Sequence, residues 1–203
     1  MSPEISKIIQ SNRDTFYDFS SGVRANLLWL RLAKLVVATA SAVLFSVFSD
    51  PFLAAVLTVY SILIGFSFNV LFQLFSFDPS SLVKGDASLE RRVRVDRLKT
   101  LGDELFYNIS YFNIVSIAVV VLALGYSFVY APVPFLRRFV HVGLFSTALA
   151  DARMYLELLK EPLRFLGCSI FYYLLIESIC TLGRTIARMS FFFSLKIRLQ
   201  NEA

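Results

Sequence analysis

The chain has 203 residues, of which 57% are hydrophobic and 17% charged, and its mean hydropathy is +0.65. In ordinary soluble domains about a quarter of the residues are charged, so this composition excludes an ordinary soluble domain. At roughly 20 apolar residues per span, the length leaves room for four or five transmembrane helices. The net charge is +5, but the basic residues cluster at the ends of apolar segments, where anionic lipid head groups explain them better than nucleic acid does. We therefore expect an all-α integral membrane protein that contacts such a bilayer and binds no nucleic acid directly.

Residues 1–26 are predicted to form an amphipathic helix that lies along the membrane surface. Ser2 followed by Pro3 is a typical helix start, and apolar residues then recur at steps of four and three, with charged residues between them. Such a helix buries its apolar side in lipid while its charged side stays in water. The apolar positions are Ile5, Ile9, Phe16, Phe19 and Val23.

Residues 27–75 are predicted to form a transmembrane hairpin of two spans. The first, about 27–48, carries Arg31 and Lys34 in its first turns, and both side chains are long enough to stretch toward the head groups. A Ser-Asp-Pro turn leads into the second span, near 52–75, which contains no charged residue. The turn is short, so we expect the two spans to pack tightly against each other.

Residues 76–104 are predicted to form a cytoplasmic connection in which basic and acidic side chains alternate. After Gly85, leucine and valine residues recur partly on one side, which indicates a helix. The arginines of this segment are candidates for holding an acidic partner protein, nucleic acid or anionic lipid, whereas their acidic neighbours favour a plain solvated helix at the lipid surface. Together with two arginines of the C-terminal tail, the candidates for contact with a partner or lipid are Arg91, Arg92, Arg94, Arg97, Arg184 and Arg188.

Residues 105–183 are predicted to hold two further spans, near 107–130 and 165–183, with an outer segment at 131–164 between them. The outer segment contains an uncharged run of only twelve residues, which is too short for a span and more typical of an amphipathic or re-entrant helix. Residues 184–203 follow as a basic cytoplasmic tail. The expected fold is therefore about four transmembrane helices plus an N-terminal interfacial helix and an outer helix.

The distribution of Lys and Arg predicts the orientation, because cytoplasmic loops are enriched in both residues. With four spans, one side of the membrane holds fifteen of them, five up to Lys34, six between Lys84 and Lys99 and four after Gly183, and the other side holds five. We therefore expect a multi-pass protein of the cell inner membrane with both termini and the 76–104 connection in the cytoplasm. A fifth span would place the basic tail outside.

The sequence carries no recognisable catalytic motif. It has a single His, and it lacks the nucleophile elbow, the phosphate-binding glycine loop and the zinc-binding helix motif. We therefore expect no enzymatic activity, no cofactor and no metal site.

Glu177 is the sharpest single feature, because it interrupts the last apolar stretch. A carboxylate in the middle of a span costs on the order of 2 to 3 kcal/mol, so it must be paired, protonated or exposed to water. A functional role would be a proton-linked switch, a pore-lining group or a clamp between subunits. A structural role would be an ion pair with Arg184, Lys34 or Arg31, or an interior hydrogen bond once the carboxyl is protonated.

Side-chain amides form a second group of polar candidates within the apolar segments. Asn69 and Gln73 lie four residues apart on one face of the second span, with Gly65 on the same stripe, and Asn113 lies near the start of the third span beside Asn108. Amides in lipid form hydrogen bonds between helices, and small residues let backbones approach. Helix packing, within or between subunits, is the simpler interpretation, and the lining of a polar pore is the alternative.

His141 lies in the outer segment beside two arginines. Its ordinary titration range makes it a candidate sensor of pH on the outer side. The alternative is an ordinary residue of an amphipathic helix.

Three classes of function remain. The first is a non-enzymatic membrane subunit that senses disturbance of the envelope and docks a soluble cytoplasmic partner. The second is a homo-oligomeric channel or membrane-disrupting effector, motivated by Asn69, Gln73 and Glu177. The third, a transporter or lipid-modifying enzyme, has no supporting motif.

A short chain with four predicted spans, a surface helix at its start and no catalytic motif resembles the membrane subunits of bacterial antiphage defence systems, in particular the KwaA subunits of Kiwa systems. The resemblance covers the architecture of the whole chain and no motif, so no site residue follows from it. It implies a self-associating inner-membrane protein that detects phage-induced disturbance and works with a soluble, nucleic-acid-binding partner.

Overall fold

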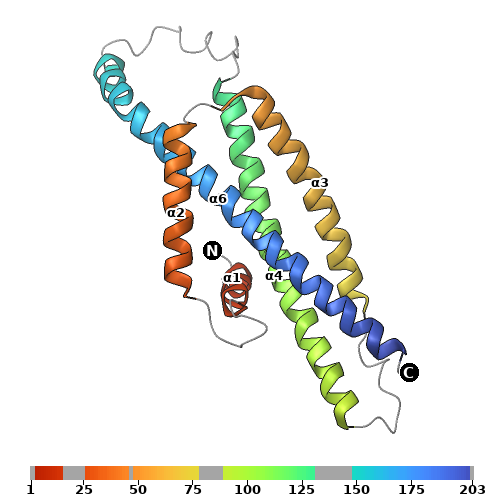
Figure 1. Cartoon of the computed structure of the whole chain (residues 1–203). Coiled ribbons are helices and arrows are strands. Elements are labelled where there is room, and N and C mark those ends of the chain that lie inside the picture. The colour runs from red at the N-terminus through yellow and green to blue at the C-terminus, as the bar shows by residue number, and fades with distance from the viewer. Residues whose placement is uncertain (1–2, 16–25, 46–47, 78–88, 131–147, 202–203) are drawn as a thin grey trace.

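The computed structural model is all-helical wherever it describes the chain, which confirms the all-α part of the predicted fold class (Figure 1). Its described part contains five helices and no strand. His141 and residues 131–147 of the outer segment predicted at 131–164 lie outside this part, and the rest of that segment belongs to α6. The structure describes residues 3–15, 26–45, 48–77, 89–130 and 148–201.

Helix α1, Pro3–Asp14, begins where the sequence predicts a helix start but ends early, with a turn at Thr15. It packs against α4 on one side, while residues 3–7 remain exposed. Asn12 and Thr15 at its end are buried. The described part of the predicted interfacial segment is therefore a part of the helical bundle, and residues 16–25 lie outside the description.

Helices α2, Leu27–Leu44, and α3, Asp50–Phe75, begin at side-chain caps. The Asn26 side chain accepts a hydrogen bond from the backbone N–H of Leu28 at 3.3 Å, and the Ser49 hydroxyl accepts one from Phe52 at 3.4 Å. Such caps satisfy backbone donors that the first turn of a helix leaves without partners.

The hairpin predicted for residues 27–75 opens in the structure. Helix α2 packs against α6 and α3 packs against α4, so that the α4–α6 pair separates them in Figure 1. The cause is the position of the buried side chains. Leu53 and Tyr60 of α3 join Val119 of α4 in one apolar cluster, and Ala42 of α2 reaches the same cluster beside Phe171 of α6.

Helices α4, Leu89–Tyr130, and α6, Ala148–Asn201, form the frame of the molecule. Their 42 and 54 residues correspond to about 63 and 81 Å at 1.5 Å per residue. The predicted connection and third span thus merge into one helix, and so do the predicted last span and tail. Pro162 lies inside α6 and does not end it.

The outer faces of the bundle are those of an integral membrane protein. Helices α3, α4 and α6 each contain a stretch long and apolar enough to cross a membrane. Large apolar side chains such as Phe72, Val121 and Ile179 are exposed on their surfaces, which soluble proteins avoid over wide areas. Helix α2 has 18 residues and is therefore about 27 Å long, whereas the hydrocarbon core of a bilayer is about 30 Å thick. That α2 is a fourth span stays a prediction.

Candidate functional site

Helices α4 and α6 run antiparallel and meet along a seven-residue repeat of buried positions. Residues further along α4 pair with residues earlier in α6, as the contacts Glu104–Arg188 and Tyr111–Glu177 show. A repeat of seven residues keeps one seam of each helix facing its partner, as in coiled coils. The buried positions are Leu98, Leu105, Phe112 and Val119 on α4, and Phe171, Ser178, Thr185, Phe192 and Leu199 on α6.

This seam is apolar at both ends and polar in the middle. Phe171 belongs to one apolar cluster and Phe192 with Leu199 to another. Between them the seam positions of α6 are Ser178 and Thr185. Neighbouring buried side chains of α6 extend this polar layer, which consists of Glu177, Ser178, Thr181, Thr185 and Arg188.

Glu177 lies at one end of the polar layer and is paired. Its Oε2 accepts a hydrogen bond from the Lys34 ammonium of α2 at 2.6 Å, and its Oε1 accepts one from the Tyr111 hydroxyl of α4 at 3.3 Å. The side chains of Lys34 and Glu177 are 7% and 9% exposed. Because a charge pair attracts more strongly where water is excluded, this contact ties three helices together at one carboxylate.

Lys34 contacts Glu177 directly, and the charge of Arg184 also interacts with this carboxylate. The Lys34 side chain is buried rather than stretched toward the head groups as the sequence predicts. Arg184 is half-buried and donates to the Thr181 hydroxyl at 3.2 Å. Arg31 is exposed on α2.

A second ion pair lies at the other end of the polar layer. Arg188 Nη1 donates to Glu104 Oε2 at 2.9 Å, and Arg188 Nη2 donates to the backbone carbonyl of Thr15. The Thr15 hydroxyl contacts Asn108 Oδ1 at 2.9 Å. Arg188 therefore fastens the end of α1 to α4, and the prediction that it contacts lipid or a partner on the surface is wrong because it is buried.

Threonine hydroxyls occupy α6 between the two ion pairs. Thr181 donates to the carbonyl of Glu177 at 2.8 Å, and Thr185 donates to the carbonyl of Thr181 at 2.9 Å. Both hydroxyls bond within their own helix. They let polar atoms line the seam without requiring partners from α4.

Helix α3 adds two hydroxyl contacts at the outer side of the layer. Tyr60 shares a hydrogen bond with Ser178, and Ser67 donates to Asn113 Oδ1. Asn113, a predicted candidate, is therefore buried and joins α3 to α4, as the packing interpretation expects. Within the described part of the chain the Nδ2 of Asn113 and the hydroxyl of Ser116 have no hydrogen-bond partner.

Asn69 and Gln73 do not join this layer. Both are exposed on α3. A Cβ atom placed on Gly65 would meet nothing within 4 Å, so the stripe predicted from the sequence faces outward. These amides and Glu177 therefore do not share one surface within a single chain.

The arginine-rich part of α4 lies on the surface of the bundle. Arg94 pairs with Glu90 one turn earlier, and the Arg97 guanidinium lies 5.5 Å from the ring centre of Phe191. Arg92 is exposed and Arg91 half-buried. This arrangement fits the solvated helix weighed above and leaves the contact role of these arginines a hypothesis.

The remaining sequence hypotheses concern pH sensing and metals. His141 lies outside the described residues. Among the residues that are described, no group of three His, Cys, Asp or Glu side chains is placed to hold a metal ion.

Several members of the polar layer were not among the predicted candidates. Ser178, Thr181 and Thr185 recur at steps of three and four on α6 and continue to Arg188, a helical period that was available as a signal. Thr15 and Glu104 lie outside α6 and contact this part of the bundle. No sequence pattern marks them, because each finds its partner more than 80 residues away in the chain.

Comparisons with known proteins do not assign the chain to a family. No protein family model matches the sequence, no curated protein matches it, and no solved structure matches the fold.

Proposed function

We propose that this protein is a non-enzymatic membrane subunit of a bacterial defence or stress system, in which the Lys34–Glu177 ion pair holds a sensing helix against a rigid frame. Disturbance of the envelope would separate the pair, and the long helices would carry the change to a soluble partner in the cytoplasm. The observation that carries the proposal is the buried ion pair between α2 and α6, completed by Tyr111 of α4.

The proposed topology has four spans, α2, α3, α4 and α6, in the inner membrane. Both termini and the start of α4 lie in the cytoplasm. The excess of Lys and Arg at those places supports this orientation. The apolar lengths of α3, α4 and α6 support three of the spans.

A buried ion pair of this kind can act as a contact with two states, one closed and one separated. While it is closed, Lys34 and Glu177 satisfy each other away from water. Once α2 moves, each charge needs water or a head group, because an unpaired charge in hydrocarbon is costly. A change in bilayer thickness tilts or shifts a short span, and α2 is the shortest of the four proposed spans.

The frame offers a route from the ion pair to the cytoplasm. Glu177 and Arg188 are on one uninterrupted helix, and so are Tyr111 and Glu104. A displacement at Glu177 therefore reaches the Arg188–Glu104 contact and the end of α1 without passing through a loop. The exposed arginines of α4 and the end of α6 then form the proposed docking surface for a soluble partner and for anionic head groups.

The resemblance to KwaA subunits favours antiphage defence as the setting and self-association as the working state. The direct test is protection against phage, measured as plaque formation on the native host carrying the wild-type locus or a Glu177→Gln variant. Protection should fall while the protein still inserts, and the exposed variant Asp50→Asn, which removes a carboxylate outside the docking surface, should protect normally. If Glu177→Gln protected as well as wild type, the ion pair would not be needed for the function.

A homo-oligomeric channel or membrane-disrupting effector is the second candidate. The observation in its favour is the exposed position of Asn69 and Gln73 on α3, because amides facing lipid gain hydrogen bonds when helices of two copies meet. Purified protein in vesicles that hold a self-quenched dye distinguishes the candidates. Leakage that depends on both amides would favour the channel, and sealed vesicles would favour the sensor.

A further inference from the structure

A cavity of about 410 Å³ opens where the end of α3 meets α4 and α6. Its wall is mainly aromatic, and Phe77 meets Phe192 edge-on with ring centres 5.6 Å apart. The volume falls within the range of small-molecule sites, roughly 300 to 1,000 Å³. The lining residues are Leu74, Phe75, Phe77, Leu98, Lys99, Gly102, Asp103, Phe106, Tyr107 and Phe192.

The cavity lies at the level where a membrane surface is expected. Residues 105 to 130 of α4 are uncharged, and Asp103 and Glu104 are the last charges before them. Lys99 therefore lies about 9 Å, and Asp103 about 3 Å, outside the apolar part of the helix at 1.5 Å per residue. Asp103 therefore lies within the head-group layer, which is about 5 to 8 Å thick on each side of the hydrocarbon core, and Lys99 lies at its outer edge.

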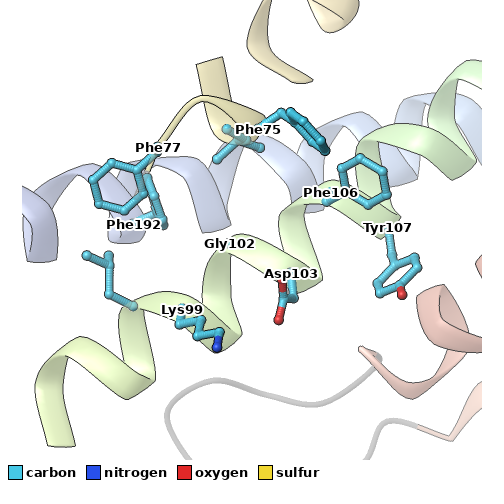
Figure 2. A pocket seen from close by; sticks show the side chains of 10 residues that line it. Phe75, Phe77, Lys99, Gly102, Asp103, Phe106, Tyr107 and Phe192 are labelled. Carbon is cyan, nitrogen blue, oxygen red and sulfur yellow. The ribbon is translucent and has the colours of Figure 1, made fainter. Parts of the chain in front are cut away.

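The lining separates apolar from polar groups. Figure 2 shows Lys99, Asp103 and the Tyr107 hydroxyl extending to one side of α4, whereas Phe75, Phe77 and Phe192 lie on the other. Phe75 is 85% exposed at the end of α3. An occupant of this cavity would therefore meet aromatic rings with one part and charged groups with another.

The two charged groups are of opposite sign and one helical turn apart. Lys99 and Asp103 flank Gly102 in the cavity wall, and the Phe192 ring lies so close to this glycine that an added Cβ would meet its Cε2 at 3.6 Å. Both side chains are exposed, and within the described residues neither forms an ion pair. A ligand with an anionic and a cationic group fits both at once, whereas a purely anionic ligand meets repulsion at Asp103.

We propose that this cavity binds a zwitterionic phospholipid that carries a phosphate and a primary amine, as phosphatidylethanolamine does. Lys99 binds the phosphate, Asp103 accepts hydrogen bonds from the ammonium group, and an acyl chain passes along Phe75 and Phe106. Charge-assisted hydrogen bonds of both kinds are the strong ones in proteins. This site is independent of the Lys34–Glu177 contact and goes beyond the proposed function.

The test uses the purified full chain in detergent and native mass spectrometry to count bound lipid. The probes are phosphatidylethanolamine, phosphatidylcholine and phosphatidylglycerol with identical acyl chains, and free phosphoethanolamine. Phosphatidylethanolamine should bind about tenfold more tightly than phosphatidylcholine, whose quaternary ammonium cannot donate to Asp103, and than phosphatidylglycerol, which has no amine. Free phosphoethanolamine should not compete at equal concentration, because it lacks the acyl chains.

Matched variants locate the site. Lys99→Gln should weaken binding about tenfold, and Asp103→Asn should abolish the preference for phosphatidylethanolamine over phosphatidylglycerol. Lys7→Gln and Asp96→Asn remove the same charges from exposed positions outside the cavity lining and should change nothing. Gly102→Phe should block binding by filling the cavity, with helix content checked by circular dichroism.

Three results would overturn the proposal. The first is equal binding of the three lipids by the wild-type chain. The second is equal loss of binding in Lys99→Gln and Lys7→Gln. The third is full competition by free phosphoethanolamine, which would assign the site to a soluble metabolite instead of a lipid.

Discussion

Lys34 and Glu177 are 143 residues apart in the chain, yet their charged atoms lie 2.6 Å apart inside the bundle. The pair joins the first long helix to the last one. Each charge makes the burial of the other possible, because removal of either partner would leave the other charge buried and uncompensated. The following predictions start from this mutual dependence.

Removing one partner of the pair should destabilise the fold more than removing both. We expect Lys34→Met and Glu177→Met each to lower the free energy of unfolding by about 3 kcal/mol, and the double variant with both substitutions to recover much of the loss. Thermal unfolding in detergent measures the double-mutant cycle. Additive losses in the double variant would show that the two side chains do not interact.

The second ion pair should control how α1 attaches to the bundle. Arg188→Met removes the contacts to Glu104 and to the Thr15 carbonyl, so we expect faster hydrogen exchange in α1 and a loss of stability of about 3 kcal/mol. Arg198→Gln, an exposed change on the same helix, is the control. If α1 of Arg188→Met were as protected from hydrogen exchange as in wild type, the Arg188 contacts would not be what holds α1 on the bundle.

The proposed topology predicts which sites share a side of the membrane. In a chain with Cys168 and Cys180 replaced by Ala, Arg92→Cys and Asn201→Cys should react with a membrane-impermeant maleimide from the cytoplasmic side. Asp50→Cys should react from the other side. Labelling of Arg92→Cys and Asn201→Cys from opposite sides would contradict four spans with both termini in the cytoplasm.

Self-association through α3 should depend on its exposed amides. Asn69→Leu with Gln73→Leu should reduce cross-linking between copies in native membranes, because the hydrogen bonds proposed between helices are each worth about 0.6 kcal/mol. Ser61→Ala is a fair control, since that exposed hydroxyl bonds to the carbonyl of Leu57 in its own helix. An unchanged oligomer would place any contact between copies elsewhere.

The sequence predicted those parts of the fold that depend on local composition. The second span was expected near 52–75 and α3 is Asp50–Phe75, because an uncharged run bounded by a proline turn is sufficient to define a helix. The need of Glu177 for a partner also followed from its place in an apolar stretch. Lys34 was one of the three cationic partners named for it.

The packing of the helices could not be predicted in the same way. Lys34 is long enough to reach either the head groups or the interior, and only the position of α6 decides between them. The turn between α2 and α3 suggested a hairpin, but the buried face of each helix selects a different partner. Contacts such as Thr15–Asn108, 93 residues apart, depend on that arrangement and leave no pattern in the sequence.

The most direct test of the central claim is the distance between α2 and α6, measured by double electron–electron resonance. Spin labels at Val36 and Ile186, both exposed, report it in a chain with both cysteines replaced. We predict one narrow distance distribution in a bilayer of matched thickness, and a shifted distribution both in a thinner bilayer and in Glu177→Gln. An identical distribution in all three samples would contradict a switch built on the Lys34–Glu177 pair.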